Sequence, residues 1–264
     1  MKVSVYDLNG KETGKIELPK VFSEPLRKDL ILRAVLASQS KGRQPHGTSE
    51  VAGMRSSAHY HGARRTGRWI MMGKEMARMP RIHGKIPGYL MYRARKVPQS
   101  TKGRLAHPPK VEKVWAQKMN KKEHKKAIMS AIAATADKKL AEARGHKFGV
   151  KELPIVVDDA VGKLKKTAEV RRVFESLGLK EEMERIEHRK VRAGKAKVRG
   201  RKYKIKIGPL LVVAKDEGVV KAAKGMGGVD VVGAKDLSVE KLAPGAMPGR
   251  LTIFTKGAIE ELGK

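Results

Sequence analysis

The chain has 264 residues, which is enough for one good hydrophobic core with extensions or for two small domains. It carries 59 Lys or Arg against 27 Asp or Glu, and a formal net charge of +32 favours a polyanionic partner. It contains no cysteine, which excludes disulfide scaffolds and thiolate zinc sites and fits a reducing compartment.

The first part of the chain is predicted to form a hairpin and a helix. Lys2–Tyr6 alternates as a strand does, and Lys15–Leu18 is expected to pair back on it. Ser23 is the expected cap of a helix that has Pro25 in its first turn and ends at Gly42. Because its apolar residues project on more than one side, this helix is expected to be largely buried.

The next segment, Lys41–Lys110, is predicted to form a long, extended, non-globular loop. It contains 16 Lys or Arg against two Glu, with nine glycines and six prolines, and it keeps no hydrophobic period. Aromatic residues and methionines are interleaved with the arginines, so flat groups can stack on bases while guanidinium groups bind phosphates. We expect the segment to become ordered on RNA, and simple disorder is the alternative. The methionines here are not expected to pack in a core.

After the loop, a capping box at Asn120–Glu123 is expected to open a long helix that Gly145 ends. Short apolar runs then alternate with helices. This rhythm predicts an open, doubly wound α/β fold with a mostly parallel sheet of about four strands. The expected strands are Pro154–Asp158, Leu210–Ala214, Val229–Val232 and Leu251–Phe254, and the expected helices are 167–177, Glu181–Glu187, Val219–Lys224, Ser238–Leu242 and Ala258–Leu262.

A second basic segment, His188–Lys206, interrupts this alternation. It has ten Lys or Arg, no acidic residue, and small residues that let the backbone approach phosphates. Together the two basic segments carry +24 of the net +32, which is the electrostatic footprint of a polyanion binder. A membrane surface would favour an amphipathic basic helix, which neither segment has. With no apolar signal core and no apolar run of membrane-spanning length, the chain is expected to be cytoplasmic.

Enzyme-like motifs lack the context that their chemistry requires. Gly62–Gly67 has phosphate-loop spacing, but Arg68 and Trp69 follow where Lys and then Ser or Thr are needed. Gly225–Gly228 precedes a strand, so a tight turn is favoured over a dinucleotide-binding loop. The pair Asp158–Asp159 is expected to cap a helix or form a turn, and the histidines are not expected to converge. We predict no catalytic residue, no metal site and no cofactor; an α/β enzyme acting on RNA is the alternative.

Several stretches match one known family in combination. They are Val5–Asp7, Phe22–Leu30, Thr66–Arg68, Ala77–Arg81, Gly103–Pro109, Arg192–Lys195, Arg199–Arg201, Leu242–Gly245 and Gly249–Thr252. Together they resemble the large-subunit ribosomal protein family L-four, of archaeal and eukaryotic type, over essentially the whole chain. The absence of a long tail after Leu262 resembles the archaeal members.

The resemblance implies a structural constituent of the ribosome that binds large-subunit (23S) rRNA and supports assembly of the large subunit. It implies a globular domain made of residues 1–40 and 111–264, which includes the basic arm 188–206. It also implies that the loop 41–110 threads through rRNA to the wall of the polypeptide exit tunnel. There the loop would lie beside the L-twenty-two family protein and the nascent peptide.

Particular residues follow from the basic segments and from this resemblance. The expected tunnel-wall residues are Arg68, Trp69, Met71 and Met72. The expected rRNA-binding residues are Arg43, His46, Arg55, Arg64, Arg65, Arg68, Arg78, Arg81, Arg93, Arg95, Lys96, Lys102, Arg104, His107, Lys190, Arg192, Lys195, Lys197, Arg199, Arg201 and Lys202.

Overall fold

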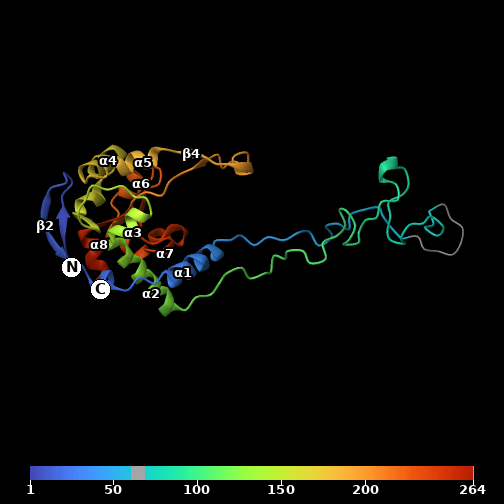
Figure 1. Cartoon of the computed structure of the whole chain (residues 1–264), viewed down its shortest axis with the longest axis horizontal. Helices are drawn as coiled ribbons and strands as arrows, with labels where there is room; N and C mark the ends of the chain where they lie inside the picture. Colours follow the sequence, from blue (N-terminus) through green and yellow to red (C-terminus); the bar gives the residue numbers. More distant parts are fainter. Residues whose placement is uncertain (61–68, 264) are drawn as a thin grey trace. The chain divides into compact units, whose positions relative to one another are not determined.

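The structure is a computed structural model that describes residues 1–60 and 69–263 (Figure 1). The chain forms two compact units. Met1–Gly42 and Ala116–Lys264 make up one of them, called here the globular unit, and Arg43–Trp115 makes up the other, called the loop unit. None of the described helices is both long and apolar enough to cross a membrane.

The globular unit is built on one six-stranded sheet with the strand order β2-β1-β3-β8-β6-β7. The pair β1–β2 is antiparallel and every other neighbouring pair is parallel, which confirms the predicted α/β class and mostly parallel sheet. The N-terminal hairpin joins the edge of this sheet, so the sheet has six strands, whereas about four were predicted. The strands are β1 (Lys2–Tyr6), β2 (Glu12–Glu17), β3 (Ile155–Val157), β6 (Leu210–Val213), β7 (Asp230–Gly233) and β8 (Thr252–Thr255).

Helices cover both faces of the sheet, because successive side chains of a buried strand point to opposite sides. Val156 and Phe254 pack on one face with residues of α1, α2, α7 and α8, whereas Ile155 and Ile253 pack on the other with residues of α3 to α6. The helices are α1 (Lys28–Lys41), α2 (Lys121–Ala133), α3 (Lys138–Ala143), α4 (Thr167–Ser176), α5 (Lys180–Glu187), α6 (Val219–Ala223), α7 (Val239–Leu242) and α8 (Lys256–Leu262).

The first helix begins later and is more exposed than the sequence predicts. Ser23 does not cap it, because Ser23 ends a short 3-10 turn, η1 (Lys20–Ser23), and its hydroxyl donates to a carbonyl of that turn at 2.7 Å. The α-helix starts only at Lys28. It is buried on one side, while Leu32 and Leu36 are 49% and 47% exposed, so the prediction of a largely buried helix was wrong.

The predicted long helix after Asn120 is two helices. Asn120 makes no side-chain cap, and the Glu123 carboxylate accepts a hydrogen bond from Arg33 at 3.2 Å, so the predicted capping box does not form. The helix is interrupted at Asp137, whose carboxylate accepts the N–H two residues later at 2.9 Å and caps α3. Gly145 follows α3 with a φ of +88°, the left-handed terminator that the sequence predicts.

Candidate nucleic-acid interface

The second basic segment folds as a hairpin that extends from the globular unit (Figure 1). Its strands, β4 (Lys190–Val191) and β5 (Tyr203–Lys204), are antiparallel. Gly194 and Gly200 adopt φ values of +73° and +80° in the connection between the strands. A side chain would strain both positions, so these glycines let a short, highly charged connection reverse direction.

Every cation from Arg189 to Lys204 is exposed to solvent. Among the described residues, no carboxylate forms an ion pair with any cation between residues 188 and 206. Like charges this close repel one another unless a polyanion or counterions neutralise them. All the predicted rRNA-binding residues of this segment are exposed, namely Lys190, Arg192, Lys195, Lys197, Arg199, Arg201 and Lys202.

Two anchors of buried charge hold the root of the hairpin on the globular unit. Arg185 on α5 donates to the Ile207 carbonyl at 2.6 Å and makes two bonds of 2.7 Å to Glu182, which is fully buried. Arg250, only 1% exposed, donates to the Gly208 carbonyl at 2.8 Å. Buried charged groups require hydrogen-bond partners, and here those partners include the backbone carbonyls that directly follow the hairpin. These bonds fix the position of the backbone at the end of the hairpin.

The two ends of the loop unit run beside each other. The N–H of Thr48 donates to the Pro109 carbonyl at 3.3 Å. Further along, a Cβ placed on Gly53 would lie 2.5 Å from the Cα of Arg104, and Gly53 has a φ of +80°. Both the space and the conformation therefore require glycine at this position.

An aromatic and cationic cluster surrounds Trp115 in the loop unit. The ring of His46 stacks on the indole with a centroid distance of 5.4 Å and an angle of 15°. Arg43 and Lys113 lie over the same ring, at 4.1 and 4.4 Å from its centroid. Cation–π contacts position these charges without neutralising them. Sequence reasoning missed Lys113 and Trp115 because it ended the loop at Lys110, although a lone Trp among lysines was a usable signal.

Arg81 organises the middle of the loop unit. Its backbone forms β-bridges with His59 on one side and Ala94 on the other. Its guanidinium donates to the carbonyls of Ala77 at 2.9 Å and of Tyr92 at 2.7 Å. These donors serve the loop's own structure, so Arg81 differs from the neighbouring cations that face solvent.

Two histidines of the loop unit converge, contrary to the prediction. The Nε2 atoms of His59 and His83 are 3.0 Å apart, because the bridge between His59 and Arg81 brings their segments together. Trp69 stacks on His83 at a centroid distance of 4.8 Å and an angle of 15°. In the part of the chain that the structure describes, no three or more His, Asp or Glu residues form a group that could hold a metal ion.

The predicted tunnel-wall residues differ in exposure. Met72 is 53% exposed, whereas Met71 is only 3% exposed and packs inside the loop unit. The expectation that no loop methionine packs in a core was therefore wrong for Met71. Trp69 is half-buried, and Arg68 lies outside the described residues.

The predicted rRNA-binding residues of the loop also fall into groups by exposure. Arg64 and Arg65 lie outside the described residues. Arg81, Arg95 and Lys96 are half-buried, and Arg95 donates to a loop carbonyl at 2.5 Å. The remaining residues are exposed, namely Arg43, His46, Arg55, Arg78, Arg93, Lys102, Arg104 and His107.

The carboxylates at the end of β3 have structural roles. Asp158 accepts the N–H of Asp159 at 2.9 Å, and Asp159 accepts the N–H of Gly257 at the start of α8, also at 2.9 Å. The pair forms a turn, as the sequence predicts, and Asp159 also links this turn to α8, which was not predicted. The Gly225–Gly228 run likewise forms a turn before β7.

An α/β unit that carries basic segments with exposed cations, and whose carboxylates serve turns and ties, is typical of a structural RNA-binding protein. Residues 16–264 match the model of the Ribosomal protein L4/L1 family. The chain belongs to this family.

Curated relatives agree over the full length. The chain is 49% identical to large ribosomal subunit protein uL4 of Archaeoglobus fulgidus, in an alignment that covers 100% of this chain and 99% of the relative. It is 47% identical to the uL4 protein of Methanopyrus kandleri, over 99% of this chain and 98% of that protein. It is 44% identical to that of Methanosphaera stadtmanae, over 99% and 96%. These findings confirm the predicted non-enzymatic, structural constituent of the ribosome, of archaeal type, and do not support the enzyme alternative.

Proposed function

We propose that the chain binds large-subunit rRNA through two surfaces, the β4–β5 hairpin and the loop unit, and so supports assembly of the large subunit. The hairpin carries this proposal, because its ten Lys or Arg have no carboxylate partner among the described residues. Phosphates of an RNA backbone would neutralise this charge, and release of their counterions would supply much of the affinity. The buried anchors at Arg185 and Arg250 make the globular unit the support for this surface.

The loop 41–110 is proposed to reach the wall of the exit tunnel, beside the L-twenty-two family protein and the nascent peptide. Family membership supports this proposal, and so does the sparse core of the loop. Of the described apolar residues in the loop unit, only Ala58 and Met71 are buried. The free energy gained from burying so few apolar side chains does not offset a backbone ordering cost of about 1–2 kcal/mol per residue. The loop therefore needs a partner such as rRNA to become ordered.

The structure separates two loop arginines that look alike in the sequence. We expect Arg78→Ala to weaken rRNA binding and to reduce the slope of log affinity against log salt by about 0.7–0.9, because Arg78 is exposed and can reach a phosphate. Arg81→Ala should change this slope less and should instead increase protease cleavage around Tyr92 in the rRNA-bound protein, because the Tyr92 carbonyl loses its donor. Filter binding over a range of salt concentrations measures the first effect. An unchanged slope for Arg78→Ala would show that this side chain does not contact phosphate.

Deleting Gly67–Gly84 tests the proposed role in the tunnel. The deleted segment holds few of the cations, so large subunits should still assemble, with the variant co-sedimenting in one copy per subunit. The response of translation to stalling peptides and tunnel-binding antibiotics should change. Ribosome profiles and drug sensitivity measure the two outcomes.

If the deletion prevents assembly of the large subunit, a double variant can test the proposed role in the tunnel. Trp69→Ala with Met72→Ala removes the large groups nearest the proposed lumen and keeps the backbone. The matched control is Val111→Ala with Val114→Ala, two exposed apolar residues elsewhere in the same unit. An unaltered drug and stalling response in both the deletion and the double variant would show that this segment does not reach the lumen.

A further inference from the structure

We infer that the apolar face of the β4–β5 hairpin, with the pocket at its root, is a docking site for a neighbouring large-subunit protein. The segment that fits it carries an aliphatic side chain next to a carboxylate. The inference rests on the proposed function in one respect, namely that the opposite face of the hairpin binds rRNA.

The hairpin has two chemically different faces. Lys190 lies opposite Lys204, and Val191 lies opposite Tyr203. Directly paired residues share a face and neighbouring residues alternate, so the lysines occupy one face and the apolar pair occupies the other. Val191 and Tyr203 are 48% and 46% exposed, and Ile205, just beyond the end of β5, is 50% exposed. A continuous exposed apolar face beside a cationic one marks a second contact surface.

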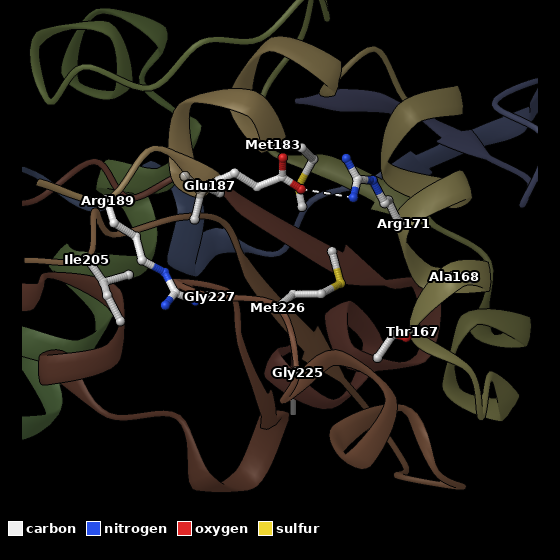
Figure 2. Close-up of a pocket in the computed structure, with 11 residues that line it drawn as sticks. Thr167, Ala168, Arg171, Met183, Glu187, Arg189, Ile205, Gly225, Met226 and Gly227 are labelled. Carbon is white, nitrogen blue, oxygen red and sulfur yellow. Dashed lines mark ion pairs between the residues drawn. The ribbon is translucent and has the colours of Figure 1, made fainter. Parts of the chain in front are cut away.

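This apolar face leads into a pocket of 550 Å³ at the root of the hairpin (Figure 2). Ile205 lines the pocket together with Met183 and Ile186 of α5 and with Met226 from the turn after α6. Figure 2 shows Met183 and Met226 directed toward each other from opposite sides of the pocket. Methionine side chains adjust their shape readily, so this lining can close around an inserted apolar group.

The chemistry of the surface favours a protein over an RNA base. Bases bind by stacking on flat aromatic rings or guanidinium planes. The large apolar side chains that line the pocket are isoleucine or methionine, which pack well against aliphatic side chains and offer no flat ring. Two guanidinium groups also line it, but Arg171 is held by Glu175 and Glu187, and the Glu187 carboxylate in the lining would repel a nucleotide's phosphate. On the exposed face, Tyr203 is accompanied by the branched residues Val191 and Ile205.

The rim of the pocket supplies one positive charge that a partner can neutralise. Arg171 is already paired, at 2.9 Å with Glu187 and at 3.1 Å with Glu175. Arg189 lines the same pocket, and within the described part of the chain it forms no ion pair. A carboxylate beside the inserted aliphatic side chain would meet this guanidinium, which is why the inferred segment combines the two groups.

Site-specific photo-crosslinking in purified large subunits tests the inference. A photoreactive amino acid replaces either Ile205 or its neighbour Lys204, which is exposed and lies on the cationic face. We expect position 205 to crosslink to one ribosomal protein, at a peptide with an aliphatic residue beside Asp or Glu, and position 204 to crosslink to rRNA. Crosslinking of 205 to rRNA alone, to a peptide without that pattern, or to nothing would overturn the inference. Loss of the rRNA crosslink at 204 alone would instead count against the proposed function.

A charge substitution gives a second, independent readout. Ile205→Asp should reduce the amount of the crosslinked protein in purified large subunits at least about tenfold, since a buried carboxylate in an apolar contact is costly. The matched control is Leu32→Asp on α1, which makes the same change at a residue that is 49% exposed, lies outside the hairpin and does not line the pocket. Equal occupancy in both variants would show that the pocket does not hold the partner.

Discussion

Glu182→Ala should lower the free energy of unfolding by about 3–5 kcal/mol, the cost of leaving a buried charge without its partner. Glu182 is fully buried and accepts two bonds of 2.7 Å from Arg185, one of 2.7 Å from His146 and one of 3.0 Å from the Lys147 N–H. Removing the carboxylate leaves the Arg185 guanidinium without its counter-charge. Urea unfolding of the free protein at neutral pH measures the loss.

The neighbouring residue offers a matched control. The Glu181 side chain is 75% exposed, and its one ion pair within the described residues is with Lys147, at 3.8 Å. Glu181→Ala removes the same charge from the same helix and should change the unfolding free energy by no more than about 0.5 kcal/mol. If both variants lost equal stability, net charge rather than the buried cluster would explain the effect.

The same cluster makes the stability of the fold depend on pH in the acidic range. Burial raises the pKa of Glu182, but hydrogen bonds from Arg185, from His146 and from the Lys147 N–H lower it more, so that the pKa lies below its ordinary value. A carboxyl group with a lowered folded-state pKa stabilises the fold fully above its unfolded pKa of about 4.3 and loses this contribution as the pH falls through the folded value. The stability difference between the wild type and Glu182→Gln should therefore shrink below about pH 4.

The sheet could be predicted because its physical signal is local. Strands such as Leu210–Val213 are buried on both faces, so they appear as unbroken apolar runs between turn residues. Two predictions were wrong for the same reason: the helix start at Ser23 and the continuous helix through Asp137. Ser, Asp and Asn can serve a turn, an interruption or a cap, and the choice depends on neighbours that local spacing does not reveal.

The basic character of the candidate interface could be predicted from the sequence. Which of its cations are exposed and which hold the loop's own structure could not. Arg78 and Arg81 sit in the same basic stretch, yet only Arg81 is held by backbone pairing with segments around His59 and Ala94. The contact between His59 and His83 depends on the same long-range pairing. Burial of Glu182 likewise results from packing between elements that are distant in the sequence. The charged residues of α5 alone therefore look like an ordinary solvated helix face, and the sequence does not reveal that Glu182 is buried.

Neutralising the tip of the hairpin should have the largest effect on RNA binding. Replacing Lys195, Lys197, Arg199, Arg201 and Lys202 with Gln should reduce the slope of log affinity against log salt by about 3.5–4.5, if each cation contacts one phosphate. Over a fourfold rise in salt, from 50 to 200 mM, the wild type should then lose about 100- to 500-fold more affinity than the variant. All of these side chains are exposed, so the variant should unfold at the same urea concentration as the wild type.

A control with the same charge loss distinguishes a binding surface from net charge. Lys138, Lys139, Lys163, Lys165 and Lys166 are also exposed, and they belong to the globular unit outside the segment 188–206. Replacing them with Gln removes an equal charge, yet it should reduce the salt slope by less than about 1, because few of these lysines would contact phosphate. Salt titrations of both variants against the same large-subunit rRNA fragment make the comparison. Equal slopes in the two variants would mean that affinity follows total charge, and the hairpin would then lose its assignment as an rRNA-binding surface.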